Sequence, residues 1–114
     1  MNVTVEKQDA ACLVKVSGEV DMNNAPQLRK ALMGLVEARS PMIIVSLAGV
    51  RYIATAGIAT LVECRQKVAQ YKGKLRLAEI RKDMFEIFKM AKLDGIFDIY
   101  TTEQEALAGV REKA

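Results

Sequence analysis

The amino-acid sequence predicts an α/β protein: one domain over residues 1–114, with a mixed, mostly parallel five-stranded sheet packed with four helices. Two observations lead to this prediction. Near the N-terminus two segments alternate apolar and polar residues, as strands do, and beyond them short apolar runs alternate with segments of helical periodicity. With 51% hydrophobic and 27% charged residues, a chain of this length can bury one core. The expected order of elements is β-β-α-β-α-β-α-β-α.

The first two strands are expected to pair with each other in an antiparallel manner, at or near an edge of the sheet. Their apolar residues occupy alternate positions and are Val3, Val5, Cys12, Val14 and Val16. A short polar turn near Gln8 separates the two segments, which favours antiparallel pairing. Residues 17–21 are expected to break the second strand. The later strands, joined by helices, are expected to run parallel to one another.

The first helix is expected to follow Asn23 or Asn24, either of which can be its N-cap. Pro26 then falls in the first turn, where the missing N–H costs little. One apolar stripe would bury this helix against the sheet and consists of Leu28, Ala31, Leu32, Leu35 and Val36. Pro41 ends the helix, and the nearly continuous apolar run at residues 42–47 is typical of a central strand covered on both sides.

The stretch at residues 47–63 connects that strand to a second helix through a cluster of small residues, which are Ala54, Thr55, Ala56 and Gly57. Thr55 is the expected N-cap. The helix is expected to end near Gly73, which can supply the left-handed conformation that follows many helices. Its buried side is expected to contain Ile58, Leu61, Val62, Cys64, Val68 and Ala69.

Two further pairs of strand and helix complete the predicted fold. A strand at residues 75–78 precedes a helix that begins near Asp83. This helix is more apolar than one buried face requires, so Phe85 or Met90 is expected to be partly exposed.

The last strand is expected at residues 96–100. Thr102 and Glu105 then have the spacing of a capping box, in which each residue bonds to the other's backbone at the start of a helix. The final helix is expected to contain Ala106, Leu107 and Val110.

The composition argues against catalysis. The chain has no His, which removes the commonest general base and the commonest metal ligand, and it has neither a GxGxxG motif nor a Walker lysine motif. Cys12 and Cys64 are too few for a zinc site or a disulfide framework and are expected to be buried thiols in a reducing compartment. We therefore predict no catalytic residue, no metal and no cofactor.

The N-terminus lacks the apolar region of a signal peptide, and no apolar run is long enough to span a bilayer, so we expect a cytoplasmic protein without a membrane partner. Lys and Arg outnumber Asp and Glu at residues 65–92, where nine basic residues accompany three acidic ones. An acidic partner would suit this segment, but a solvated set of helix and turn residues is the favoured interpretation. Because stacking aromatic residues are missing, we do not expect a nucleic-acid partner.

The start of the second helix is the candidate working surface. Unpaired N–H groups and the positive end of the helix dipole lie at such a start, and the small residues around Thr55 allow another protein to approach the backbone. The Thr55 hydroxyl is either a cap that serves the fold alone or a site that a phosphate could modify. Glu19 and Asp21, beside Gly18, are either paired carboxylates with a role or two solvated acids.

Two segments and their spacing resemble the STAS domain, the family of bacterial anti-sigma factor antagonists. Residues 16–21, with Gly18, Glu19 and Asp21, look like that family's Gly-Glu-Leu-Asp turn. Residues 50–58 look like its Asp-Ser-Ser-Gly-Leu loop at the start of the second helix, where Gly57 matches the loop glycine and Thr55 the first hydroxyl position. The resemblance extends over essentially the whole chain in the order and length of the elements.

The resemblance implies a partner switch. In the family, an antagonist with an unmodified loop binds a kinase-type anti-sigma factor, and phosphorylation of a loop Ser or Thr breaks the complex. Here the usual acceptor position is Ala56 and the usual Asp is Ala54, so the switch cannot operate at Ala56. Either this chain always binds, or Thr55 replaces Ala56 as acceptor, or its partner does not use phosphorylation.

The prediction is therefore a non-enzymatic protein-binding domain, a monomer or weak dimer. It is expected to bind a kinase-type anti-sigma factor through the exposed face of the second helix and through residues that match the two motifs, which are Gly18, Glu19, Asp21, Ala54, Thr55, Ala56, Gly57 and Ile58. One alternative is a subunit of a larger STAS scaffold, with an interface around Phe85 and Met90. Another is a small-molecule or nucleotide-binding domain that uses the start of the second helix.

Overall fold

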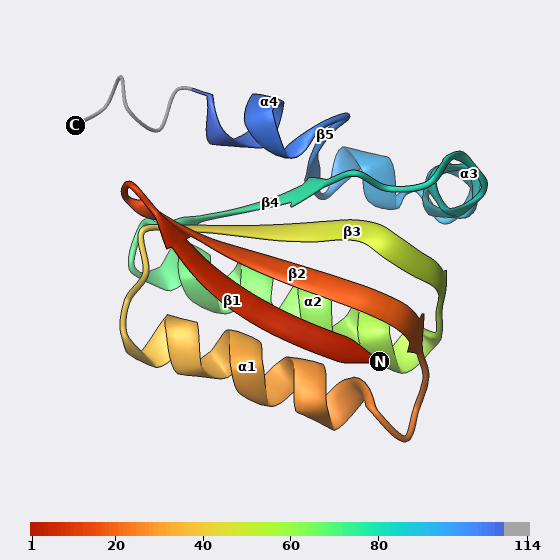
Figure 1. Cartoon of the computed structure of the whole chain (residues 1–114), viewed down its shortest axis with the longest axis horizontal. Helices are drawn as coiled ribbons and strands as arrows, with labels where there is room; N and C mark the ends of the chain where they lie inside the picture. The colour runs from red at the N-terminus through yellow and green to blue at the C-terminus, as the bar shows by residue number, and fades with distance from the viewer. Residues whose placement is uncertain (109–114) are drawn as a thin grey trace.

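In the computed structural model, which describes residues 1–108, five strands form one sheet in the order β1-β2-β3-β4-β5 (Figure 1). The β1–β2 pair is antiparallel and the other pairs are parallel. This confirms the predicted mixed sheet with the first strand at an edge. The elements are β1 (Asn2–Gln8), β2 (Ala11–Val20), α1 (Ala25–Glu37), β3 (Met42–Ile53), α2 (Thr55–Gln70), β4 (Lys74–Ala78), α3 (Lys82–Met90), η1 (Leu93–Gly95), β5 (Asp98–Tyr100) and α4 (Glu103–Leu107).

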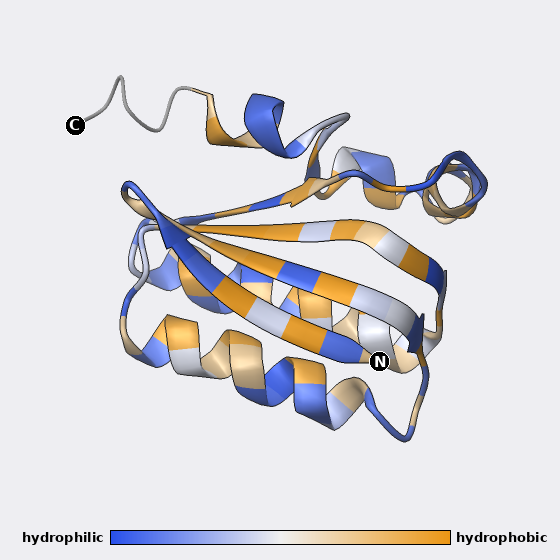
Figure 2. Cartoon of the chain, viewed as in Figure 1, coloured by the Kyte–Doolittle hydropathy of each residue, from blue (hydrophilic) through white to orange (hydrophobic). Residues whose placement is uncertain are grey.

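The sheet separates two apolar clusters of unequal size. Helices α1 and α2 lie side by side on one face, and α4 lies on the other (Figure 1). The larger cluster is on the side of α1 and α2, and it also receives Met84 and Phe88 from α3. The smaller cluster lies under α4 and consists of Ala11, Leu13, Met42, Ile44, Ala78 and Ala106. Figure 2 shows apolar and polar residues alternating along β1 and β2, whereas the first half of β3 is mostly apolar, as a central strand requires.

The two central strands are longer than predicted. β2 continues to Val20, so the prediction that residues 17–21 break it was wrong, and β3 continues past Leu47 to Ile53. The extension pairs Val20 with Ile53 after two shifts of register between β2 and β3, and at each shift β3 has one residue more than β2. Such bulges interrupt the alternation of apolar and polar residues along β3, and this hides the second half of that strand from a periodicity argument.

The prediction that Gly73 takes the left-handed conformation after α2 was wrong. Lys72, with φ of 66°, and not Gly73, takes the left-handed conformation. Gly73 is required for another reason, because a Cβ there would lie 2.8 Å from side-chain atoms of both Val68 and Tyr71. Ala69, predicted to be buried in α2, is exposed.

The C-terminal third differs from the prediction in one strand. β5 begins at Asp98, and Phe97 before it is a buried core residue outside the strand. Half of the predicted capping box is confirmed: the Glu105 N–H donates to Thr102 Oγ1 at 3.0 Å, whereas the Glu105 carboxylate accepts from the Thr102 hydroxyl at 3.2 Å instead of from the Thr102 N–H. The predicted helical residue Val110 lies outside the described residues.

Arg76 on β4 departs from the prediction of a solvated basic segment. It is buried under α4, where Nη1 donates to the carbonyl oxygens of Ala106 at 2.6 Å and Ala108 at 3.2 Å. The guanidinium carbon also lies 5.1 Å from the centre of the Tyr100 ring. A cation at the C-terminal carbonyl groups of α4 complements the negative end of that helix. Arg76 therefore helps to hold α4 on the second face of the sheet.

Candidate partner-binding site

The two segments that carry the predicted site lie together at one end of the molecule. Because β2 and β3 are parallel neighbours, their carboxyl ends meet at the same edge of the sheet (Figure 1). Glu19 is paired with Tyr52, and the Ala54 N–H donates to the Val20 carbonyl oxygen at 2.8 Å. The structure thus places the turn after β2 beside the start of α2.

The connection from β2 to α1 is held by reciprocal hydrogen bonds. Asp21 Oδ1 accepts from the N–H groups of Asn23 and Asn24, both at 2.9 Å, and Asn24 Oδ1 accepts from the Asp21 N–H at 2.8 Å. Asn24 occupies the N-cap position of α1, one of the two predicted, but its side chain does not cap that helix. The arrangement is that of a capping box formed one turn earlier, with Asp21 as the capping residue.

The two acidic residues of this turn have different surroundings. Asp21 is half-buried and its carboxylate is engaged with backbone N–H groups, so it maintains the turn. Glu19 is exposed, and its carboxylate makes no hydrogen bond or ion pair with any other residue in the described range 1–108. Gly18 is half-buried with φ of 90°, a conformation that side chains disfavour. Of the three, Glu19 has the side chain that can reach a partner without disturbing the fold.

The connection from β3 to α2 is a single residue, Ala54. Ala54 is the N-cap with ψ of 167°, and α2 begins at Thr55, so the prediction that Thr55 caps the helix was wrong. β3 stays paired through Ile53, so Ala54 is the single residue between the strand and the helix and takes the N-cap position. No side chain caps α2. Thr55 is exposed, and its hydroxyl makes no hydrogen bond with any residue of the part that the structure describes.

The other residues around this turn are partly or fully buried. Ala54, Ala56 and Ile58 are half-buried, and the last two pack on the main core. Gly57 is buried, and a Cβ at this position would lie 2.7 Å from Val20 Cγ1 and from Ile53 Cγ1. Gly57 therefore lets α2 approach the ends of β2 and β3, whereas Thr55 is the exposed residue of the turn.

Two exposed apolar residues beside this turn were not predicted as site residues. Tyr52, at the end of β3, is 51% exposed, and Met22, in the turn after β2, is 75% exposed. The sequence does contain a hint that Met22 is exposed, because it is an apolar residue among Asp21, Asn23 and Asn24. No periodic pattern, however, marks it as a site residue. Large apolar side chains that stay exposed next to a polar turn are typical of protein-binding surfaces.

A bidentate ion pair joins the two helices that follow these connections. Arg29 Nε and Nη2 on α1 each donate to a carboxylate oxygen of Glu63 on α2, both at 2.8 Å. These hydrogen bonds are the main reason that the pKa of the Glu63 carboxyl lies below its ordinary value and the pKa of Arg29 above its own. The pair links α1 and α2 at the surface, where an exposed ion pair adds little to stability.

Metal binding, nucleophilic attack and membrane insertion each require particular residues or helices. Within residues 1–108, no group of three or more His, Cys, Asp or Glu side chains could hold a metal ion. Cys64 lies on the inner side of α2, and burial raises the pKa of its thiol to about 12, which keeps it protonated at neutral pH. None of the described helices has the length and apolar character needed to cross a bilayer.

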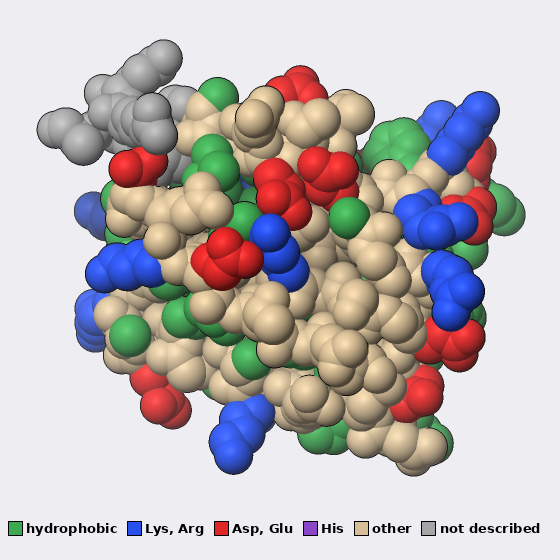
Figure 3. Space-filling view, in the orientation of Figure 1, with side chains coloured by type: hydrophobic (Ala, Val, Ile, Leu, Met, Phe, Trp, Pro, Cys, Tyr) green, Lys and Arg blue, Asp and Glu red, His purple; other side chains and the backbone are tan. Residues whose placement is uncertain are grey.

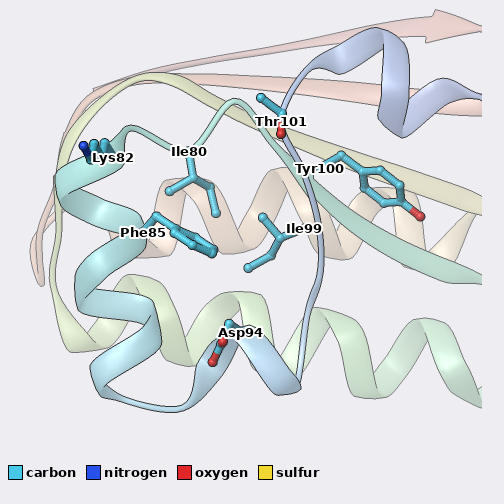
Figure 4. A pocket seen from close by; sticks show the side chains of 7 residues that line it. All are labelled: Ile80, Lys82, Phe85, Asp94, Ile99, Tyr100 and Thr101. Atoms are coloured by element: carbon cyan, nitrogen blue, oxygen red, sulfur yellow. The ribbon is translucent and has the colours of Figure 1, made fainter.

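A groove of about 440 Å³ lies at the ends of β4 and β5. Its apolar floor consists of Ile80, Phe85 and Ile99, which point toward one another in Figure 4. Lys82 and Asp94 also line it. No residue of the 54–58 segment does so, and the groove therefore does not support a ligand site at the start of α2.

The mixed sheet and the two adjoining turns define the class of this protein: a small α/β domain whose candidate site is an exposed surface at the strand ends. The model of the STAS domain family matches residues 2–106, and the chain belongs to that family. Family membership confirms the resemblance stated from the two motifs.

Similar proteins are anti-sigma factor antagonists. The chain is 29% identical to the anti-sigma-B factor antagonist of Bacillus subtilis, over 87% of this chain and 90% of that protein. It is 25% identical to the anti-sigma-B factor antagonist of Listeria monocytogenes, over 92% and 95%. The crystal structure of an anti-sigma factor antagonist from Mycobacterium paratuberculosis superposes with a TM-score of 0.87 at 28% identity, covering 96% of this chain and 93% of that one.

Proposed function

We propose that this chain is a non-enzymatic antagonist that binds a kinase-type anti-sigma factor through the 54–57 turn and the adjoining turn at Gly18, Glu19 and Asp21. The observation that carries the proposal is the small-residue start of α2, where Thr55 is exposed, beside the exposed Glu19. The names of the similar proteins support an antagonist over a ligand-binding domain.

The expected contacts follow from the exposure of each residue. Ala54 and Thr55 carry small side chains, so a partner can approach the backbone of the α2 start. Tyr52 and Met22 supply apolar area at the sides, and aromatic residues and Met are enriched in interfaces. Glu19 supplies a negative charge that a basic partner group can pair with.

Phosphorylation at the usual position is not available to this chain, because Ala56 has no hydroxyl. Thr55 has an exposed hydroxyl that the fold does not use. A phosphate on Thr55 would add a charge of about −1.5 to −2 within the proposed interface. We propose that binding is not switched at Ala56, and that Thr55 is the residue of this turn to examine for modification.

The binding proposal is tested by calorimetric titration against a purified kinase-type anti-sigma factor from the same genome, with Thr55→Arg and the matched variant Gln104→Arg. Both positions are exposed on a helix, but Gln104 is on α4, which lies on the face of the sheet opposite α2 (Figure 1). We expect Thr55→Arg to weaken binding at least about tenfold, or 1.4 kcal/mol, and Gln104→Arg to bind like the wild type. Equal affinities for all three proteins would refute the proposed surface.

The modification is tested by intact mass measurement after incubation with ATP and the same partner. A gain of one phosphate that Thr55→Val lacks would identify Thr55 as the acceptor. An unmodified mass, under conditions that modify an antagonist with a loop serine, would mean that regulation acts on the partner instead.

A further inference from the structure

The last strand of the sheet leaves part of its backbone unpaired. β5 stands at the end of the strand order, and within residues 1–108 its only neighbour in the sheet is β4. The Glu79 N–H donates to the Tyr100 carbonyl oxygen at 3.3 Å, so the backbone groups of Tyr100 point toward β4. Because these groups alternate in direction along a strand, the N–H and C=O groups of Ile99 point away from β4, to the open edge.

The groove of about 440 Å³ lies between this strand and α3. Ile99 and Tyr100 line it from β5 and Phe85 lines it from α3, and in Figure 4 the side chains of Ile80, Phe85 and Ile99 point toward one another between the two elements. An apolar floor alone would suit many occupants. A backbone donor and acceptor on the same residue, Ile99, are best paired by another backbone, and an extended peptide supplies both the hydrogen bonds and a side chain for the floor.

Two side chains of opposite charge also line the groove. Lys82 and Asp94 are exposed, and neither side chain forms an ion pair or a hydrogen bond with another residue of the part that the structure describes. They appear on opposite sides of the apolar floor in Figure 4, and Figure 3 shows basic and acidic side chains close together around α3. Lys82 follows the end of β4 and Asp94 precedes the start of β5, so the two charges mark the two ends of the groove along β5.

We propose that this groove binds an extended peptide segment of a partner protein, which adds to the sheet as a strand antiparallel to β5, the more stable of the two directions. An apolar residue of the peptide pairs with Ile99 and places its side chain on the floor. Because side chains alternate along a strand, an acidic residue two positions before it faces Lys82 and a basic residue two positions after it faces Asp94. The proposal is independent of the proposed function, since no residue of the groove belongs to the turns at residues 18–21 and 54–57.

The first test is a fluorescence-polarisation titration of the full chain, up to roughly 1 mM, against the labelled peptide Glu-Thr-Val-Thr-Lys blocked at both ends. Two altered peptides are compared with it: Lys-Thr-Val-Thr-Glu, which exchanges the charges, and the original peptide with an N-methyl group on Val, which removes the main-chain donor to Ile99. We expect each alteration to weaken binding at least about threefold. No binding of the original peptide would overturn the proposal, and equal binding of the N-methylated peptide would show an apolar site without strand addition.

Variants of the chain test where the peptide lies and in which direction. Lys82→Glu should weaken binding of the original peptide at least about threefold, whereas Lys30→Glu, an equally exposed position on α1 outside the groove, should bind it like the wild type. The double variant Lys82→Glu with Asp94→Lys should prefer the peptide with exchanged charges. Circular dichroism spectra identical to the wild type would show that the variants are folded. Equal weakening by Lys30→Glu and Lys82→Glu would overturn the groove as the site, and a double variant that still prefers the original peptide would overturn the antiparallel direction.

Discussion

The two connections at the site end of the molecule join a central strand to a helix in contrasting ways. Between β2 and α1 the chain uses four residues, and polar side chains hold them, since Asp21 and Asn24 bond to each other's backbone. Between β3 and α2 it uses Ala54 alone, and no side chain caps the helix. Because Gly57 has no Cβ, the helix can pack closely against Val20 and Ile53 there.

The comparison separates residues that build the site from residues that can face a partner. The motif resemblance treats Gly18, Glu19 and Asp21 as one set, and residues 54–57 as another. The structure divides each set: Asp21 and Gly57 face inward or bond to the backbone, whereas Glu19 and Thr55 extend from the surface. Loss of binding after a change at Asp21 or Gly57 therefore says little about contact unless stability is measured as well.

Gly57→Ala should have the largest effect on stability. Its Cβ would lie 2.7 Å from two core side chains, so α2 must shift or the core must repack, which typically costs about 1–3 kcal/mol. Urea denaturation followed by circular dichroism measures the loss.

Gly34→Ala is the control for Gly57→Ala. Gly34 lies in α1 with no atom within 4 Å of the position of its Cβ, and Ala is favoured over Gly inside a helix by about 0.5–1 kcal/mol. We expect this variant to be more stable than the wild type. If both variants changed stability in the same direction, Gly57 would not be needed for the close packing of α2 against the strands.

Asp21→Ala should have the next largest effect, a loss of about 1–2 kcal/mol, because it removes the acceptor for two backbone N–H groups in the turn before α1. Glu19→Ala, two residues away, should leave the unfolding midpoint unchanged, because that carboxylate has no partner within residues 1–108. Equal losses in the two variants would contradict the distinction between a structural and a free carboxylate.

The sequence predicted the order of elements, the mixed sheet and the cap at Thr102, because periodicity and capping are local properties. It did not reveal the extensions of β2 and β3, since bulges interrupt the alternation and the pairing of Val20 with Ile53 is not local. The misplaced cap at Thr55 follows from the same omission. The burial of Arg76 depends on α4 crossing the sheet, which no pattern around residue 76 encodes.

The ion pair between α1 and α2 should have a smaller, pH-dependent effect. The pKa of Glu63 is lowered in the folded state, so the pair stabilises the fold above the ordinary pKa of a Glu carboxyl and is lost as pH falls through the lowered value. Thermal unfolding of wild type and Glu63→Gln should therefore differ at neutral pH and converge in acid. A difference that persisted at the lowest pH would have to come from packing.

Thr55→Ala should have little effect on stability. A Thr that caps a helix contributes about 1 kcal/mol, but Thr55 is the first helical residue and caps nothing. Ala is the better helix former, so the variant should unfold at the same denaturant concentration as the wild type or slightly above it. A loss near 1 kcal/mol would show that the hydroxyl serves the fold after all. If stability is unchanged, any change in anti-sigma factor affinity or phosphate uptake in Thr55→Ala must arise at the surface. A variant of Gly57 cannot establish this, because any side chain at position 57 also disturbs the core.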